Sequence, residues 1–572
     1  MSLKSFLIGS PLSSKDEAHQ RLRKFIALPV FASDAISSTA YATDEILVVI
    51  LLQAGVGVTA FRPLMPIAIV VCVLMAIVVA SYRQTIFAYP SGGGAYIVSR
   101  ENLGETPALV AGASLLVDYI LTVAVSVAGG VLAMRTAFGF DRSLAVPICL
   151  ACIFVMTVMN LRGVKESGAA FAGPTYFYIV MLLILVVTGL WRVYVQHVGP
   201  IPQSMLSEDA RRVSEQTGGL GLMMLLRAFS SGAVALSGVE AVSNGVPAFE
   251  KPESKNAATT LMWMGGILGS TFFGVSVIAS HLRPYRGESD GNGLGLLAEY
   301  LYHGRGVLFW MTMIATFAIL ILAANTAYAD FPRLASIIAR DGFLPRQFFN
   351  KGARLVFSNG VLFLAGVASL LIVAFGGDIS KLIPLYAFGV FTGFTLSQTG
   401  MVRHHLRHRE GNWRGAMCIN AVGALTTGLI AVIVVVSKFT EGAWIPAVLI
   451  PGAVAGFRAI GRHYARSREA VQVTPGYVAP RETHTMVVLV GGINKGVIHG
   501  LRYAQSLNPD RLYALTVVSS DEESATMDRL WAEFGIDIPL VHEYSEYREL
   551  TGSVLRFIDE LDSRHDDDII TV

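Results

Sequence analysis

Three acidic side chains, Asp34, Asp118 and Glu240, lie in three different long apolar stretches of the chain. An ionised carboxylate at the centre of a membrane helix costs roughly 3 kcal/mol even on the more lenient insertion scale, so such residues usually belong to an ion or proton pathway. Each acid could instead be neutralised by a proton or by nearby hydroxyl and backbone groups. The presence of three acids favours a pathway for a positive ion.

Hydroxyl groups accompany the acid of the third stretch. Thr122 follows Asp118 by four residues and Ser126 follows Thr122 by four, so these side chains share one face of a helix. Tyr119 lies three residues before Thr122. The alternative for both short hydroxyls is a bond back to their own helix. Carboxylate, hydroxyl and carbonyl oxygens with few nitrogens suit a hard cation that needs no strict geometry.

The two other stretches add hydroxyl groups near their acids. Tyr41 follows Asp34 by seven residues and returns to a similar face if the helix resumes after an interruption. Ser237 precedes Glu240 by three residues. We therefore expect oxygens from three helices to converge.

The composition is that of a membrane protein built from many helices. Only 15% of its 572 residues are charged, against about 25% in globular proteins, and 53% are hydrophobic. A helix of about 20 apolar residues crosses the bilayer core, and twelve segments are long enough. The predicted helices are 25–52, 63–88, 107–134, 143–161, 172–195, 219–248, 257–281, 306–330, 355–376, 380–402, 415–437 and 441–462.

Polar residues interrupt the first and the sixth of these helices, at 33–39 and at 230–240. Unwound backbone is tolerated at membrane depth only where protein or a water-filled cavity surrounds it. Interruptions at matching places predict two five-helix halves of opposite topology with a site between them. Lys and Arg are more frequent in the loops on the side of the N-terminus, which places both chain ends in the cytoplasm. The net charge of +2 gives no reason to expect binding to nucleic acid.

The pattern changes after about residue 465. From 486 onward, short apolar runs alternate with amphipathic stretches, as in a parallel sheet covered by helices on both faces. The last run, 568–572, is typical of a strand cut short, which predicts a truncated chain. The predicted domains are an N-terminal cytoplasmic segment (1–24), a transmembrane domain (25–465) and a cytoplasmic α/β domain (466–572).

The sequence around both interruptions resembles that of the amino acid–polyamine–organocation superfamily. Within it, the chain is similar to the KimA-type bacterial potassium–proton symporters, from about residue 24 to 462 and into the tail. The segments that carry the resemblance are 33–45, 89–96, 230–249 and 385–394. Residues 89–96, Tyr-Pro-Ser-Gly-Gly-Gly-Ala-Tyr, are common to the wider superfamily, and we expect them to form a loop that folds back into the cytoplasmic vestibule.

The resemblance implies a polytopic α-helical, LeuT-like fold of about 12 transmembrane helices in a 5+5 inverted repeat, with a universal-stress-protein-like α/β parallel-sheet domain at the C-terminal end. Ser237 stands where the family has threonine, which keeps the hydroxyl. The implied potassium site consists of Asp34, Tyr41, Thr122 and Ser126, and the cation-binding residues also include Tyr119, Ser237, Glu240 and Tyr386.

The resemblance also implies a homodimer held by the tail domains, and in some members a tail inhibited by cyclic di-AMP. Gly491, Gly492 and Lys495 follow a predicted strand and could meet a phosphate of such a nucleotide. A plain turn is the other interpretation, because the loop lacks the Lys-Ser/Thr pair of a phosphate-binding loop.

Together these features predict a secondary active potassium importer, coupled to protons, that works by alternating access in the bacterial inner membrane. A carboxylate held away from water binds a proton more readily, so Asp34, Glu240 and Asp118 are the candidate proton carriers, and the choice among them is open. We find no nucleophile-elbow, Walker or zinc-ligand pattern, so we expect no enzyme and no cofactor.

The main alternative is a proton-coupled amino acid or polyamine permease of the same superfamily. An amino acid's carboxylate is usually held on exposed N–H groups at a broken helix, where glycine permits close approach. No glycine flanks Asp34, and its carboxylate would repel that anion. A polyamine is not disfavoured in this way. A non-transporting membrane sensor is a further alternative, which the interrupted helices disfavour.

Overall fold

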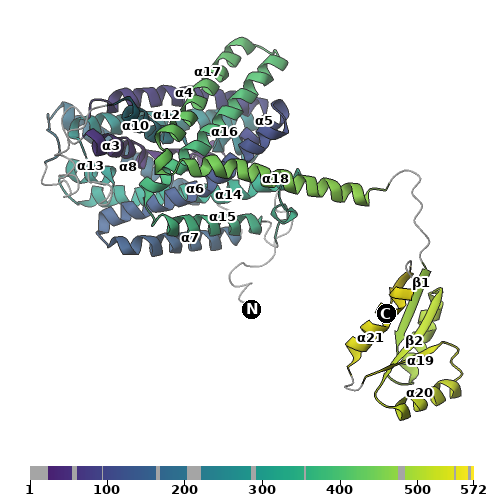
Figure 1. Cartoon of the computed structure of the whole chain (residues 1–572). Helices are drawn as coiled ribbons and strands as arrows, with labels where there is room; N and C mark the ends of the chain where they lie inside the picture. The colour runs from purple at the N-terminus through teal and green to yellow at the C-terminus, as the bar shows by residue number, and fades with distance from the viewer. Residues whose placement is uncertain are drawn as a thin grey trace. The chain divides into compact units, whose positions relative to one another are not determined.

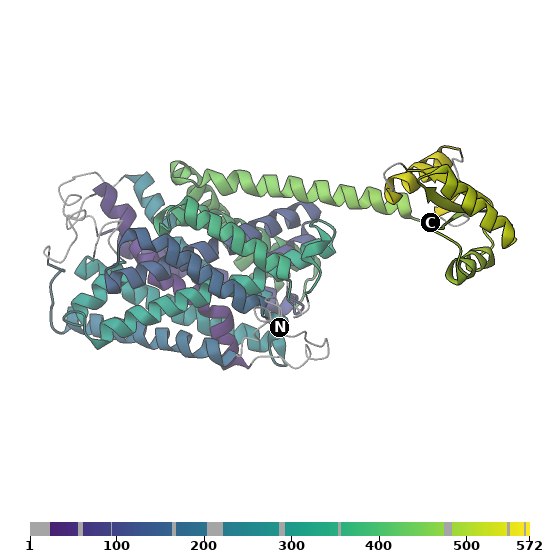
Figure 2. The same ribbon diagram turned by 90° about the horizontal axis from the view of Figure 1, so that it is seen from below.

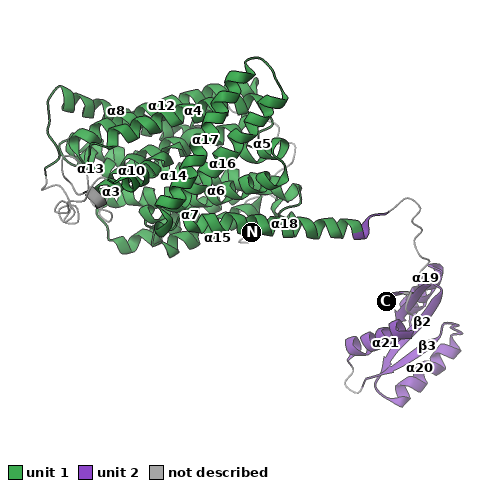
Figure 3. Cartoon of the chain, turned by 45° about the horizontal axis from the view of Figure 1, so that its top comes forward, with its two compact units in different colours: residues 1–469 green, residues 470–572 purple. Residues whose placement is uncertain are grey.

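The computed structural model describes residues 23–54, 61–92, 94–162, 168–202, 221–284, 292–352, 356–473, 483–545, 549–564 and 568–572. The chain divides into two compact units, Met1–Glu469 and Ala470–Val572 (Figure 3). The predicted N-terminal segment, 1–24, lies almost entirely outside the described residues.

The first unit is a bundle of apolar helices, most of which lie roughly along one direction (Figures 1 and 2). Within the described residues, eleven helical segments are long and apolar enough to cross a membrane. The remaining predicted span is α15 (Ser358–Ala374), whose 17 residues reach about 26 Å, slightly less than the bilayer core. The unbroken long helices are α4 (Leu64–Ala88), α6 (Glu105–Phe138), α7 (Ala145–Leu161), α8 (Gly168–Tyr194), α12 (Glu253–Leu282), α14 (Val307–Arg340), α16 (Ile379–Arg407), α17 (Trp413–Ser437) and α18 (Trp444–Val471).

Shorter elements connect the spans. The predicted loop at 89–96 is only partly a loop, because a turn at Tyr89–Gly92 leads into a helix that begins at Gly94. The short connecting elements are α5 (Gly94–Asn102), α13 (Gly293–Leu301), η3 (Arg142–Leu144), η6 (Val246–Ala248), η7 (Arg346–Phe348) and η8 (Phe439–Glu441).

Both predicted interruptions are breaks in helices. The first lies slightly further along the chain than predicted, and the second falls within the predicted range of 230–240. The first span consists of α2 (Lys24–Ser37), η2 (Ser38–Ala40) and α3 (Ala42–Ala54). The sixth consists of α10 (Leu222–Gly232), η5 (Ala233–Leu236) and α11 (Ala241–Asn244). Serine and threonine bond to nearby carbonyls, so polar residues can remain helical, as residues 33–37 do. The breaks fall in the first and sixth spans, as a five-plus-five fold requires.

The second unit confirms the predicted parallel sheet. Its strand order is β3-β2-β1-β4, and all neighbouring strands are parallel. Alternation along β2 places Leu515 against Phe557 of α21, and Ala514 in the cluster that contains Trp531 of α20 on the other face. The elements are β1 (Thr483–Leu489), α19 (Lys495–Ser506), β2 (Arg511–Val518), α20 (Asp521–Glu533), β3 (Leu540–Tyr544), α21 (Leu550–Arg564) and β4 (Asp568–Thr571).

Candidate functional site

The two helix breaks are joined directly. The hydroxyl of Ser38, in η2, donates to the carbonyl of Ala35 at 2.6 Å and lies 3.1 Å from the carbonyl of Ala235 in η5. Neighbouring hydroxyls bond to the end of α2 in the same way, since Ser37 donates to the carbonyl of Asp34 at 2.7 Å. The first break therefore sits beside the second, although about 200 residues separate them in the chain.

Gly238 permits this close approach. Its φ of +74° is left-handed, and a Cβ atom at this position would lie 2.6 Å from Oδ2 of Asp34 and 2.8 Å from the backbone nitrogen of Ala35. No glycine flanks Asp34 in the sequence, yet one lies against it in space. The carboxylate of Asp34 thus points at the break of the sixth span, and no side chain separates the two.

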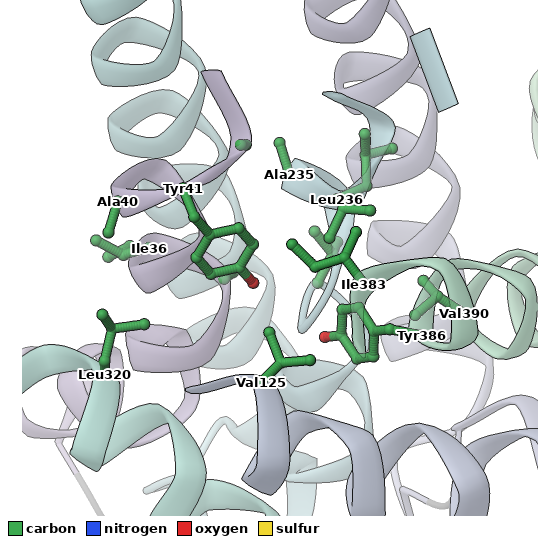
Figure 4. Close-up of a cluster of buried hydrophobic side chains, with 14 of the residues drawn as sticks. Ile36, Ala40, Tyr41, Val125, Ala235, Leu236, Leu320, Ile383, Tyr386 and Val390 are labelled. Carbon is green, nitrogen blue, oxygen red and sulfur yellow. The ribbon is translucent and has the colours of Figure 1, made fainter. Parts of the chain in front are cut away.

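The predicted hydroxyl groups gather beside this contact. Figure 4 shows Tyr41, from the end of the first break, and Tyr386, from α16, with their hydroxyl ends turned toward one another. Thr122 of α6 donates to the hydroxyl of Tyr386 at 3.3 Å. Ser237 lies within interaction range of both tyrosines.

The carboxyl groups form a second cluster next to the hydroxyls. Asp118 and Glu240 are in side-chain contact, and each interacts electrostatically with Asp34. Among the described residues, Oδ1 of Asp118, Oε2 of Glu240 and Oγ of Ser237 are buried and have no hydrogen-bond partner of ordinary geometry. Buried polar atoms normally have partners, so these oxygens are where a bound cation or proton is expected.

All eight predicted cation-binding side chains are buried. None exposes more than 7% of its surface. Ser126 lies one helical turn beyond Thr122 on α6, and Tyr119 accepts a hydrogen bond from the amide of Asn244 at 2.8 Å. The enclosed oxygens come from four spans: Asp34 and Tyr41 from the first, Tyr119, Thr122 and Ser126 from the third, Ser237 and Glu240 from the sixth, and Tyr386 from the tenth.

Asp330 is a buried acid that the sequence analysis missed. It lies in α14, is 6% exposed, and interacts electrostatically with Asp34 and Glu240. Its ion-pair partner is Arg333, at 3.9 Å, one turn further along the same helix. The predicted span 306–330 ends at this residue, so the sequence does not single it out as an acid within a helix. The helix continues for ten residues and places Asp330 within the bundle.

The glycine-rich turn contacts the same region through Asn244. A Cβ atom on Gly94, whose φ is +49°, would lie 1.8 Å from Oδ1 of Asn244, and one on Gly92 would lie 2.7 Å from its carbonyl oxygen. Since Asn244 also donates to Tyr119, the turn is connected to the cation site through one side chain.

In the second unit, the predicted phosphate-contacting residues lie at the carboxyl end of β1. Lys495 begins α19, and Asn494 caps this helix by accepting a hydrogen bond from the backbone nitrogen of Val497 at 3.1 Å. Gly491 lines a cavity of about 790 Å³, whose other lining residues include Glu522 and Glu523. These carboxylates would repel a phosphate on that wall of the cavity.

Comparison with known proteins places the chain among transporters. Residues 27–454 match the family model described as amino acid permease, and residues 482–572 match the KimA potassium transporter C-terminal domain. The potassium transporter KimA of Bacillus subtilis is 40% identical over 565 residues, which cover 98% of this chain and 91% of that protein.

Two weaker matches have other substrates in their names. The mitochondrial cationic amino acid transporter 3 of Arabidopsis thaliana is 24% identical over 66% of this chain and 62% of its own. A crystal structure of the Eremococcus coleocola manganese transporter aligns with 82% of this chain and all of its own, at 14% identity and a TM-score of 0.42. The family models and the relative at 40% identity show that this multi-pass membrane protein belongs to the KimA-type potassium transporters of the amino acid permease family.

Proposed function

We propose that the chain imports potassium together with protons, and that the cation binds between the two helix breaks. Asp34 supplies the charge, and Tyr41, Thr122, Ser126 and Ser237 supply neutral oxygens. The observation that carries this proposal is the set of buried oxygens without hydrogen-bond partners, on Asp118, Ser237 and Glu240, within the described bundle. A partly dehydrated ion satisfies the oxygen of Ser237, because its ligands replace water, and a proton satisfies those of Asp118 and Glu240. The relative at 40% identity, KimA, is a potassium transporter, which supports the choice of ion.

The proton is carried by the pair of Asp118 and Glu240. Two carboxyl groups in contact are stable when they share one proton, since two like charges at that separation repel strongly. Asp34 interacts with both members of the pair, so a cation beside Asp34 changes how firmly the pair holds its proton. This linkage couples the two ions without a direct contact between them.

The position of the breaks supports transport by alternating access. With both chain ends in the cytoplasm, α3 and α10 point outward from the site, while α2 and α11 lie on the cytoplasmic side. The half-helices can then rock about the breaks to open one side at a time. In the bacterial plasma membrane, the proton gradient would drive uptake.

The alternative of an amino acid or polyamine substrate is disfavoured by the enclosed site. Gly238 brings the break of the sixth span directly onto Asp34, where a permease would hold the carboxylate of an amino acid. Every predicted ligand is at most 7% exposed, which suits an ion better than a molecule with several carbon atoms.

The test is flux into liposomes that contain the purified protein. We expect uptake of ⁸⁶Rb⁺, a stand-in for potassium, to increase with an inwardly directed proton gradient and to compete with K⁺. Arginine, lysine, putrescine and spermidine should neither compete nor be taken up. Asp34→Asn should abolish uptake while the protein still elutes as a folded species. Full Rb⁺ uptake by that variant, or proton-driven uptake of an amino acid or polyamine, would refute the proposal.

The tail domain is the proposed site of regulation and of a homodimer. Gly492 and Lys495 are the residues that would contact a phosphate of cyclic di-AMP. Lys495→Ala should weaken inhibition by that nucleotide in the liposome assay and leave uptake without nucleotide unchanged. Size-exclusion chromatography with light scattering on the full chain would report the oligomeric state.

A further inference from the structure

Lys438 is a buried lysine that the proposed transport mechanism does not use. It follows the last residue of α17 and is 2% exposed. Its ammonium donates to the hydroxyl of Ser231, in α10, at 2.5 Å. A lysine side chain is almost never buried without charged partners, so its surroundings must compensate the charge.

Glu45 supplies the opposite charge. It lies in the first turn of α3, is 6% exposed, and interacts electrostatically with Lys438. The hydroxyl of Ser380, at the start of α16, donates to Oε1 of Glu45 at 3.2 Å. The ammonium of Lys438 therefore contacts one hydroxyl and is attracted by one carboxylate, and a second hydroxyl is bonded to that carboxylate. The three groups come from three helices.

A second pair of charges lies beside this group. Arg227 forms an ion pair with Glu441 at 3.6 Å, and both side chains are partly exposed to solvent. Each also interacts electrostatically with Lys438, with opposite signs. The arginine and the glutamate offset one another, so Glu45 remains the acid whose charge Lys438 balances.

The group is located next to the cation site, on the side of α3 and α10. Glu45 lies one turn from Tyr41, to whose carbonyl its backbone nitrogen donates at 2.9 Å. Ser231 lies two residues before η5, which contains the carbonyl of Ala235 that contacts Ser38 of the first break. Lys438 therefore joins both broken helices just beyond the site, from an element that belongs to neither.

We propose that Glu45, Ser231 and Ser380 form a second monovalent-cation site, which the ammonium of Lys438 occupies in this conformation as a tethered substitute for the transported ion. The inference rests on the proposed potassium transport, and it assigns this site to the end of the pathway that α3 and α10 enclose. An ammonium carries the same charge as potassium and also binds oxygens. An apolar residue would seal this end with less desolvation, so the buried charge points to a role in ion passage. Entry of a cation from this side requires that Lys438 withdraws.

The test is the number of Rb⁺ ions bound by the purified full chain at equilibrium. Lys438→Met removes the ammonium and keeps most of the side-chain volume, so it should bind one more Rb⁺ per chain than the unchanged protein. Lys438→Arg keeps the charge and should bind no extra ion. Adding Glu45→Gln or Ser231→Ala to Lys438→Met should remove the additional Rb⁺. An ion bound at the additional site should also stabilise Lys438→Met against thermal unfolding. This stabilisation should be larger with K⁺ and Rb⁺ than with Li⁺.

The outcomes separate this inference from the proposed function. An unchanged stoichiometry in folded Lys438→Met would overturn the inference, whether or not the unchanged chain transports Rb⁺. Failure of Lys438→Met and Lys438→Gln to fold in saturating Rb⁺, while Lys438→Arg folds, would also overturn it, because a vacated cation site would be refilled by that ion. Absence of Rb⁺ uptake by the unchanged chain would contradict the proposed function instead.

Discussion

Replacing Gly238 by alanine tests whether the contact between the two breaks builds the cation site. The new Cβ would lie 2.6 Å from Oδ2 of Asp34 and 2.8 Å from the nitrogen of Ala35, closer than Cβ atoms approach in proteins. Left-handed backbone costs alanine about 1–2 kcal/mol. Overpacking against a backbone atom adds about 1–3 kcal/mol. Together, the two costs disfavour the present contact by about 2–5 kcal/mol. The protein can avoid them by moving α2 away from the sixth span.

Because every 1.4 kcal/mol or so is a factor of ten, the lower end of this range reduces the population of the binding-competent arrangement roughly 30-fold. We expect the half-saturation concentration for Rb⁺ in the liposome assay to rise by about that factor, or uptake to vanish. Gly139→Ala is the matched control, since its φ of +70° is nearly the same and no atom lies within 4 Å of its added Cβ. Unchanged Rb⁺ affinity in Gly238→Ala would refute the reasoning, and equal losses in both variants would show that backbone strain alone is responsible.

Two further changes probe the region around the site. Asp330→Asn removes the charge of one of the four acids in the cluster that contains Asp34 and should lower the rate of proton-driven Rb⁺ uptake at least severalfold. Asp562→Asn, in the tail, should leave the rate unchanged. An unchanged rate in Asp330→Asn would exclude Asp330 from the pathway. Gly94→Ala would place a Cβ 1.8 Å from Oδ1 of Asn244 and should break the hydrogen bond of Asn244 to Tyr119, so we expect slower uptake than in Gly139→Ala, measured in the same liposomes.

The sequence alone was enough to predict the site residues that differ sharply in polarity from their neighbours in the chain. Asp34, Asp118 and Glu240 stand out because an acid is rare within an apolar stretch. The strands and helices of the tail were also predictable, since alternation and amphipathic spacing are local patterns. Lateral contacts are not local, and so the contact of Gly238 with Asp34 could not be read from spacing.

Two charged residues were missed for a related reason. Asp330 precedes Pro332 and Arg333, a sequence typical of the end of a membrane helix, yet α14 contains the proline and continues. Lys438 lies between two apolar segments and was expected in a loop, but its long side chain reaches back to Ser231 within the bundle. In both cases, tertiary packing decided the environment of a residue at a predicted boundary.

The balance of charge at the site gives a physical reason for coupling. The carboxyl groups of Asp34, Asp118, Glu240 and Asp330 form one electrostatically linked cluster. Arg333 is a cationic side chain that interacts with this cluster through Asp330. Left without ions, the cluster would carry a large negative charge in a medium of low dielectric constant, at high cost. A proton shared by Asp118 and Glu240 and a cation beside Asp34 remove most of that charge together. Reorientation with only one of the two ions bound keeps more charge buried, so the bundle should rock mainly when both are present.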